Sequence, residues 1–217
     1  MLLSWSGGKD AAWALHVLRQ DPEVELAALF TTIDETTARV PIHEVHADLL
    51  AAQARAAGVP IRFVPLPPRC RNAQYERAVL AFLSEEKEKG ATHVAFGDLF
   101  LEDIRRYRER QLGASGLGLL FPLWGKPTAA LAREMTAAGL QARITSVDTS
   151  RAPGEWAGRV FDAAFVASLP AGVDPCGENG EFHTFVFEGP MLRVPVACSA
   201  GPLRQAAGFA YSELSLA

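Results

Sequence analysis

The feature that most constrains the fold is a regular alternation of short apolar runs with longer amphipathic runs over the first hundred residues. Runs that are apolar on both faces are typical of buried parallel strands, and they occur at 1–4, 26–31, 61–66 and 93–96. The segments between them have helical character, with glycine after the second and third, and lie at 9–20, 43–57 and 72–89. Strands and helices that alternate at this spacing form right-handed β–α–β units. The pattern therefore predicts an α/β domain with a parallel sheet.

The pattern changes near residue 121 and predicts a second, smaller unit. A helix is expected at 128–138, a strand at 141–147, and short helical pieces near Trp156 and over 161–168. Residues 181–216 alternate in polarity and contain several glycines and prolines, which is typical of short antiparallel strands. We therefore predict two domains, an α/β domain over residues 1–125 and a smaller α+β domain over residues 126–217.

The composition is that of a soluble globular protein. Of the 217 residues, 49% are apolar and 21% charged, so the chain can bury a core without disulfides or a structural metal. The net charge of −4 argues against a protein whose main partner is a nucleic acid. No apolar run is long enough to cross a membrane, and the N-terminus does not resemble a signal peptide. We expect a cytoplasmic protein.

The cysteines and histidines form no metal or redox motif. Cys70, Cys176 and Cys198 are widely spaced, and none belongs to a C-x-x-C pair. His43 and His46 do not have the H-E-x-x-H spacing of a zinc helix, so we expect solvated or helix-capping histidines. Incidental thiols in a reduced environment are the simplest interpretation.

A glycine loop at residues 6–10, Ser-Gly-Gly-Lys-Asp, joins the first predicted strand to the first predicted helix. Glycines allow the backbone to turn tightly, and the free N–H groups at the start of a helix attract anions. Lys9 can add positive charge, and Asp10 can orient the loop or hold Mg²⁺ through water. The alternative is a plain strand–helix turn capped by Ser6. The predicted nucleotide-binding residues here are Ser4, Ser6, Gly7, Gly8, Lys9 and Asp10.

A charged segment follows the fourth predicted strand. Ligands of open α/β sheets bind at the carboxyl ends of the strands, so Gly97 and Asp98 are also predicted to contact the nucleotide. Arg105, Arg108 and Glu109 are candidate substrate-binding residues, because an arginine pair can hold a polyphosphate or a carboxylate. A solvated helix with pairs such as Glu102–Arg106 remains the alternative.

The second polar cluster lies in the glycine-rich stretch 173–185, just before an apolar run. Carboxylates there can act as general bases, and the amide, imidazole and hydroxyl groups can recognise a substrate. We predict that Glu178 and Glu181 are catalytic, together with Lys9 and Asp10. Asn179, His183 and Thr184 are predicted to bind the substrate.

These segments together resemble a known family. The glycine loop is similar to the SGGxDS loop of the PP-loop ATPases, with Ala11 in place of the last serine. Over nearly its whole length the chain looks like the diphthine–ammonia ligase family. The resemblance rests on residues 6–10, on 97–109, on Phe-Pro-Leu-Trp-Gly at 121–125, and on 174–185.

The resemblance implies a Rossmann-like nucleotide α-hydrolase domain, a smaller C-terminal domain and a cleft between them. It also implies that ATP, with Mg²⁺, adenylates the carboxylate of diphthine on elongation factor 2 or of a related acceptor, and that ammonia then displaces AMP. Residues 6–10 would hold the phosphates, with Gly97 and Asp98 near the nucleotide. The acceptor side of the cleft would be formed by Glu178, Asn179, Glu181, His183 and Thr184.

Two other functions are compatible with the sequence. The shared loop is also found in enzymes that thiolate tRNA, although the sequence shows neither paired cysteines nor a basic surface for RNA. Ala11 leaves open an adenine-nucleotide-binding protein without catalysis, because one hydroxyl donor to phosphate is missing. A homodimer is kept as an open alternative.

Overall fold

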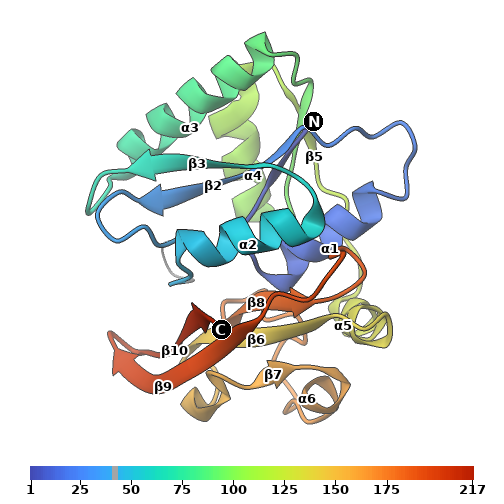
Figure 1. Cartoon of the computed structure of the whole chain (residues 1–217), viewed down its shortest axis with the longest axis vertical. Helices are drawn as coiled ribbons and strands as arrows, with labels where there is room; N and C mark the ends of the chain where they lie inside the picture. Colours follow the sequence, from blue (N-terminus) through green and yellow to red (C-terminus); the bar gives the residue numbers. More distant parts are fainter. Residues whose placement is uncertain (41–43) are drawn as a thin grey trace.

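The computed structural model describes residues 1–40 and 44–217, and its first half is built on a five-stranded parallel sheet. The strand order is β3-β2-β1-β4-β5, so the chain starts in the centre of the sheet and winds outward in both directions (Figure 1). The predicted parallel sheet is thus confirmed, with one additional short strand at its edge. The strands are β1 (Leu2–Ser4), β2 (Ala28–Asp34), β3 (Ile61–Leu66), β4 (His93–Ala95) and β5 (Gly118–Leu120).

Helices cover both faces of this sheet. α1 (Lys9–Leu18) and α2 (Ala47–Ala57) lie on the face toward the second half of the chain (Figure 1). α3 (Asn72–Glu88) and α4 (Glu102–Leu112) lie on the other face, and a 3₁₀ turn at Gly113–Ser115 follows α4. The charged segment after β4 is therefore helical, as the solvated-helix alternative required.

α2 begins later than the sequence pattern indicated. His46 is its N-cap, and the His46 imidazole accepts a hydrogen bond from the Asp48 N–H. The capping role expected of a histidine is confirmed at this position, and the helix ends at Gly58 in the left-handed conformation. His43, the first residue of the predicted helix, lies outside the described residues.

The second half is an antiparallel sheet with short helices. Its order is β7-β6-β10-β9, and β8 also pairs with β6. The strands are β6 (Gln141–Asp148), β7 (Val160–Phe161), β8 (Phe182–Glu188), β9 (Cys198–Ala206) and β10 (Phe209–Leu216). The helices are α5 (Thr128–Ala137), the 3₁₀ turn η2 (Gly154–Trp156) and α6 (Ala163–Ala167). The predicted domain boundary at 125/126 falls between β5 and α5.

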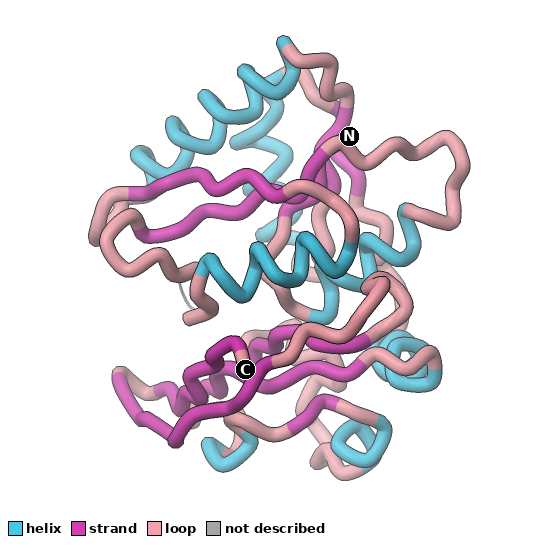
Figure 2. Tube along the Cα trace, viewed as in Figure 1, coloured by secondary structure: helices cyan, strands magenta, loops and turns pink. Residues whose placement is uncertain are grey.

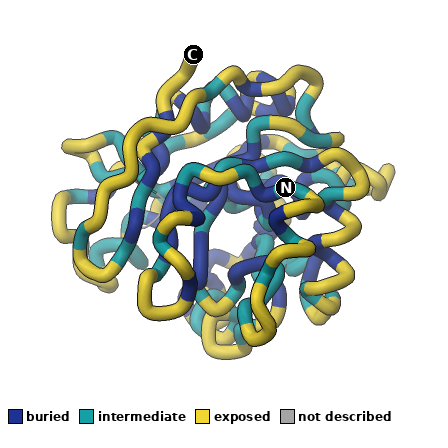
Figure 3. The backbone as a smooth tube through the Cα atoms, turned by 90° about the horizontal axis from the view of Figure 1, so that it is seen from below, coloured by how far each residue is buried: buried dark blue, intermediate teal, exposed yellow. Residues whose placement is uncertain are grey.

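One continuous apolar core joins the two sheets. It contains buried residues of β1, α1 and α2 together with buried residues of β6 and β8, so α1 and α2 are packed between the sheets (Figure 2). A second apolar cluster lies under α3 and α4 on the outer face of the parallel sheet. Seen from below, buried backbone runs through the middle of the molecule (Figure 3). The core fixes the start of α1 against β8.

No helix in residues 1–40 and 44–217 is both long enough and apolar enough to cross a bilayer.

Candidate nucleotide and acceptor site

A polar cavity lies where the carboxyl ends of β1 and β4 meet the loop before β8. We call it the central cavity. It brings together three segments that are far apart in the sequence: the glycine loop (residues 6–10), the turn after β4, and residues 176–184. Its lining consists of Ser4, Ser6, Gly8, Lys9, Asp10, Ala11, Gly97, Asp98, Cys176, Gly177, Glu178, Phe182, His183 and Thr184.

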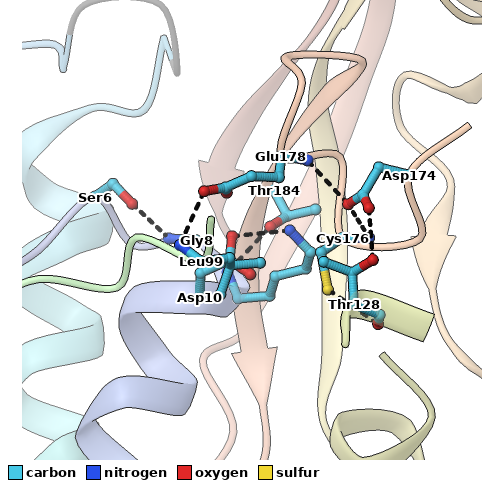
Figure 4. A network of polar contacts seen from close by, with 10 residues as sticks. Ser6, Gly8, Asp10, Leu99, Thr128, Asp174, Cys176, Glu178 and Thr184 are labelled. Carbon is cyan, nitrogen blue, oxygen red and sulfur yellow. Dashed lines mark hydrogen bonds and ion pairs between the residues drawn. The ribbon is translucent and has the colours of Figure 1, made fainter. Parts of the chain in front are cut away.

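The glycine loop turns sharply and begins α1. Gly7 has φ = +79°, and a Cβ there would lie 2.6 Å from Leu50 Cδ2, so this position requires glycine. The Ser6 hydroxyl accepts a hydrogen bond of 3.3 Å from the Gly8 N–H. The Lys9 N–H donates to the Thr184 hydroxyl at 3.1 Å (Figure 4). The loop is therefore held both by its own serine and by β8.

Gly97 lies directly against the first turn of α1. A Cβ at this position would approach the carbonyl carbon of Asp10 to 2.8 Å and the backbone nitrogen of Ala11 to 2.9 Å. Both are backbone atoms and cannot move aside as a flexible side chain does. The missing side chain lets the turn after β4 approach the N-terminal end of α1, which is the end of a helix that favours an anion.

Lys9, which is buried, and Asp10, which is partly exposed, form an ion pair at the base of the cavity. Lys9 Nζ lies 2.9 Å from Asp10 Oδ2 and also faces the rings of Phe161 and Phe182, at 5.8 and 5.5 Å from their centroids. Burial opposes the charge on Lys9, but the neighbouring Asp10, with Cys176 and Glu178, raises its pKa overall. Burial raises the pKa of Asp10, and Lys9 partly offsets this effect. Lys9 is therefore a positive charge fixed beside the helix terminus.

The segment 174–181, which we call the acidic loop, presents Glu178 to the cavity. Asp174 Oδ1 accepts hydrogen bonds from the N–H groups of Cys176 (2.9 Å) and Glu178 (3.2 Å). Glu178 Oε1 then accepts a hydrogen bond of 2.9 Å from the Leu99 N–H (Figure 4). A side chain from the loop before β8 thus contacts the loop that follows β4 in the first sheet.

Three titratable groups in the cavity are perturbed mainly by burial. Burial raises the pKa of Glu178 to about 7, and the Leu99 N–H opposes this rise. Burial, with a smaller contribution from Lys9, lowers the pKa of His183 to about 4, so the imidazole is neutral at physiological pH. Burial also raises the pKa of the Cys176 thiol, which argues against a nucleophilic thiolate. Glu178 is the group poised to exchange a proton near neutral pH.

Several predicted site residues lie outside the cavity lining. Arg105 stacks on the rings of Phe121 and Trp124 and pairs with Glu109 at 2.9 Å, as a surface helix residue does. The expected Glu102–Arg106 pair is present at 3.8 Å.

Arg108 pairs with Asp98 at 2.5 Å, so it holds a carboxylate that lines the cavity. Glu181 Oε1 accepts hydrogen bonds from the Asp174 N–H and the Asn179 amide, at 3.0 and 3.2 Å. Glu181 and Asn179 therefore brace the acidic loop from within, and the predicted catalytic position of Glu181 is not at the cavity surface.

Two organising residues were not singled out from the sequence. Gln53 on α2 is fully buried, and its amide donates to the carbonyls of Gly7 (2.9 Å) and Val186 (2.6 Å) while accepting from Trp5 Nε1 (3.0 Å). A glutamine in an alanine-rich helix carries no motif, so nothing in the sequence marked it. Asp174 belongs to the segment 174–185 that carries the family resemblance, but its type is also that of an ordinary turn residue.

The comparison with known protein families agrees with this geometry. Residues 1–118 match the family model described as "Diphthamide synthase N-terminal domain", and residues 127–203 match "Diphthamide synthase C-terminal domain". The chain belongs to the diphthamide synthase family. The two family domains correspond to the parallel-sheet half and the antiparallel-sheet half, and the central cavity lies between residues of both. No curated protein matches the chain closely enough to add to these findings.

Proposed function

We propose that the protein is an ATP-dependent carboxylate–ammonia ligase that forms AMP and pyrophosphate, with diphthine on elongation factor 2 or a related carboxylate as acceptor. One observation carries the proposal: a single cavity is lined both by the glycine loop at the start of α1 and by Glu178 of the acidic loop. The first supplies anion-binding groups and the second a base, which are the two functions that this reaction class needs.

The glycine loop is assigned to the phosphates. The dipole of α1, whose N-terminal end lies at the cavity, and the fixed charge of Lys9 would stabilise the negative charge that develops on the leaving pyrophosphate. Ala11 lines the cavity in place of a serine hydroxyl. The backbone amides remain in place, so we expect weakened phosphate binding and not its loss.

Mg²⁺ fits the residues present. Besides Lys9, the lining carries the carboxyl groups of Asp10, Asp98 and Glu178, which would repel a bare polyphosphate. Within residues 1–40 and 44–217 no cluster of three or more candidate ligands forms a protein cage for a metal, and Asp10 Oδ1 is buried without a hydrogen-bond partner. Mg²⁺ is typically held by one or two carboxylates, waters and substrate phosphates. We assign Asp10 as its protein contact, where the ion would neutralise phosphate charge.

The acceptor side is assigned to Glu178, His183 and Thr184. With a pKa near 7, Glu178 can accept a proton from the attacking ammonia nitrogen as the amide forms. Neutral His183 can donate or accept a hydrogen bond without adding charge to the cavity. The Thr184 hydroxyl is shared with the Lys9 N–H and so links the acceptor side to the phosphate side.

The test is to incubate the protein with Mg-ATP, ammonium and diphthine-bearing elongation factor 2 and to identify the nucleotide products and the modified residue. AMP and pyrophosphate that appear only with acceptor and ammonium would support the proposal. ADP as the sole product would refute it. AMP formed only with tRNA and a sulfur donor would favour the thiolation chemistry instead.

A second candidate is adenine-nucleotide binding without turnover, which is favoured by Ala11 in the cavity wall. Calorimetry separates the two functions. Glu178→Gln should leave ATP binding intact under both, but it should abolish product formation only if the protein is a ligase. Restoring the hydroxyl with Ala11→Ser should tighten ATP binding, because a hydrogen bond to a charged group contributes about 1.5–3 kcal/mol.

A further inference from the structure

Asp174 is the first residue of the acidic loop, and both of its carboxylate oxygens accept hydrogen bonds. Oδ1 accepts from the N–H groups of Cys176 and Glu178, at 2.9 and 3.2 Å, and Oδ2 accepts from the Thr128 hydroxyl at 2.6 Å (Figure 4). The Asp174 carbonyl also accepts from the Gly177 N–H at 2.8 Å. One side chain therefore fixes the backbone on either side of Gly177 and ties it to the start of α5.

The rest of the loop leaves little freedom around this anchor. Gly177 has φ = +65°, and a Cβ there would lie 2.8 Å from the Phe182 carbonyl oxygen. Glu181 is buried and accepts from the Asp174 N–H at 3.0 Å, which closes the loop on itself. The loop conformation thus depends on two carboxylates that do not line the cavity, Asp174 and Glu181.

The position of Glu178 follows from this bracing. Its backbone N–H is held by Asp174, and its side chain extends to the Leu99 N–H, which lies two residues beyond Gly97. Gly97 in turn packs against the backbone of Asp10 and Ala11. A shift in the acidic loop would therefore move the Glu178 carboxylate relative to the glycine loop.

We propose that Asp174 is a positioning residue that holds Glu178 at its hydrogen bond to Leu99 and at a fixed position relative to the glycine loop. The part of this inference that concerns turnover rests on the function proposed above. Asp174 does not contact the reacting groups and acts only through the backbone at Cys176 and Glu178.

The first test is amide hydrogen exchange at Leu99, which requires no turnover. Asp174→Ala should increase the exchange rate of the Leu99 amide by about tenfold or more, and Glu178→Ala should do the same, because both changes remove the acceptor from reach. Asp174→Asn keeps an oxygen for the two N–H groups and should leave the rate near that of the wild type. The Leu29 amide, bonded to the Pro60 carbonyl at 2.8 Å in the core, serves as the control for global unfolding.

The second test is kinetic and uses the same variants. Asp174→Ala should lower kcat by about 10²-fold, as expected when a catalytic group is displaced by about 1 Å, while the calorimetric Kd for Mg-ATP stays unchanged. Asp174→Asn should restore most of kcat. The double variant Asp174→Ala/Glu178→Ala should be no slower than Glu178→Ala alone, because one residue acts through the other.

If Asp174→Ala does not fold, Thr128→Val removes one hydrogen bond to Oδ2 and should raise Leu99 exchange in the same direction by a smaller factor. Unchanged Leu99 protection in the folded Asp174→Ala variant would overturn the proposal. So would a further loss of kcat in the double variant. If the protein forms no amide with any acceptor, the proposed function fails, yet the exchange result still decides the placement of Glu178.

Discussion

The backbone N–H of Lys9 donates a hydrogen bond of 3.1 Å to the hydroxyl of Thr184, a residue 175 positions later in the chain. This contact joins the first turn of α1 to β8 and thereby joins the two sheets at the central cavity. Gly8 lies against the same residue, since a Cβ there would be 3.1 Å from the Thr184 carbonyl oxygen. A ligand bound at the glycine loop would consequently contact groups that are held in place by the second sheet.

Thr184→Val tests this link, because valine keeps the shape of threonine but lacks the hydroxyl. Thr184 is 2% exposed, so the Lys9 N–H would lose its acceptor in a buried place. We expect the free energy of unfolding to fall by about 1–3 kcal/mol and ATP binding to weaken. Urea denaturation and calorimetry measure the two effects. Thr184→Ser keeps the hydroxyl and should retain most of the stability and most of the ATP affinity. Equal losses in the valine and serine variants would contradict the role of the hydrogen bond.

Gly97→Ala tests the close approach of the turn after β4 to α1. The added methyl group would meet backbone atoms of Asp10 and Ala11 at 2.8–3.0 Å, so one of the two segments must shift. We expect a loss of about 1–3 kcal/mol in the free energy of unfolding and a larger loss of ATP affinity than in the control Gly113→Ala. Gly113→Ala is the matched control, since nothing lies within 4 Å and its φ of −54° is helical. Wild-type ATP affinity in Gly97→Ala would rule out a role in ATP binding for the close approach of this turn to α1.

The sequence allowed much of the parallel half to be predicted, because its signals are local. The apolar runs and glycine stops located β2 and β3 and the helices after them to within a few residues. β5 was missed because Gly118–Leu120 is only three residues long and its strand character comes from pairing with β4. For the segment after β4, the charge pattern fitted a helix and a ligand-binding segment equally well, and only the contacts of Arg105 with Glu109, Phe121 and Trp124 distinguish them.

The motifs of the candidate site could be predicted from the sequence, but the hydrogen bonds that join its segments could not. Residues 6–10 and Glu178 could be selected because their types and spacing carry chemistry. The link from Thr184 to Lys9 and the bridge formed by Gln53 join segments that are remote in the chain, so no periodicity encodes them. Glu181 and Glu178 are chemically equivalent in the sequence, and only the fold buries one inside the loop and turns the other into the cavity.

Gln53→Met tests the bridge beneath the glycine loop. Methionine has a similar length but would leave the Trp5 indole N–H without its acceptor, and the carbonyls of Gly7 and Val186 without this donor. We expect a loss of about 3 kcal/mol in the free energy of unfolding, together with weaker ATP binding. Gln111→Met is a suitable control, because Gln111 is 8% exposed and, among the described residues, its Nε2 has no partner. Comparable losses of stability and ATP affinity in Gln53→Met and Gln111→Met would contradict a specific role for the Gln53 hydrogen bonds.

The pH dependence of the proposed reaction should report Glu178. A base with a pKa raised to about 7 must lose its proton before it can accept another, so kcat/KM should rise with pH and level off above about 7. Glu178→Gln should lower the plateau strongly and remove this limb of the profile. Initial rates of AMP formation at constant ionic strength between pH 5.5 and about 8.5 measure it. A profile that is unchanged in Glu178→Gln would assign the base to another residue.

Stability should show the opposite trend at the same residue. Because burial raises the pKa of Glu178 from its ordinary value of 4.5 to about 7, the native state holds this proton more tightly than the unfolded chain does. The contribution of Glu178 is therefore fully present below pH 4.5 and is lost as the pH rises through about 7. Glu178→Gln removes this dependence and retains an oxygen that can accept from the Leu99 N–H. We expect the variant to gain stability relative to the wild type between pH 5 and about 8 in urea denaturation. A difference that does not change with pH would mean that burial does not raise the pKa of Glu178, and the cavity would then lack a base whose pKa is matched to neutral pH.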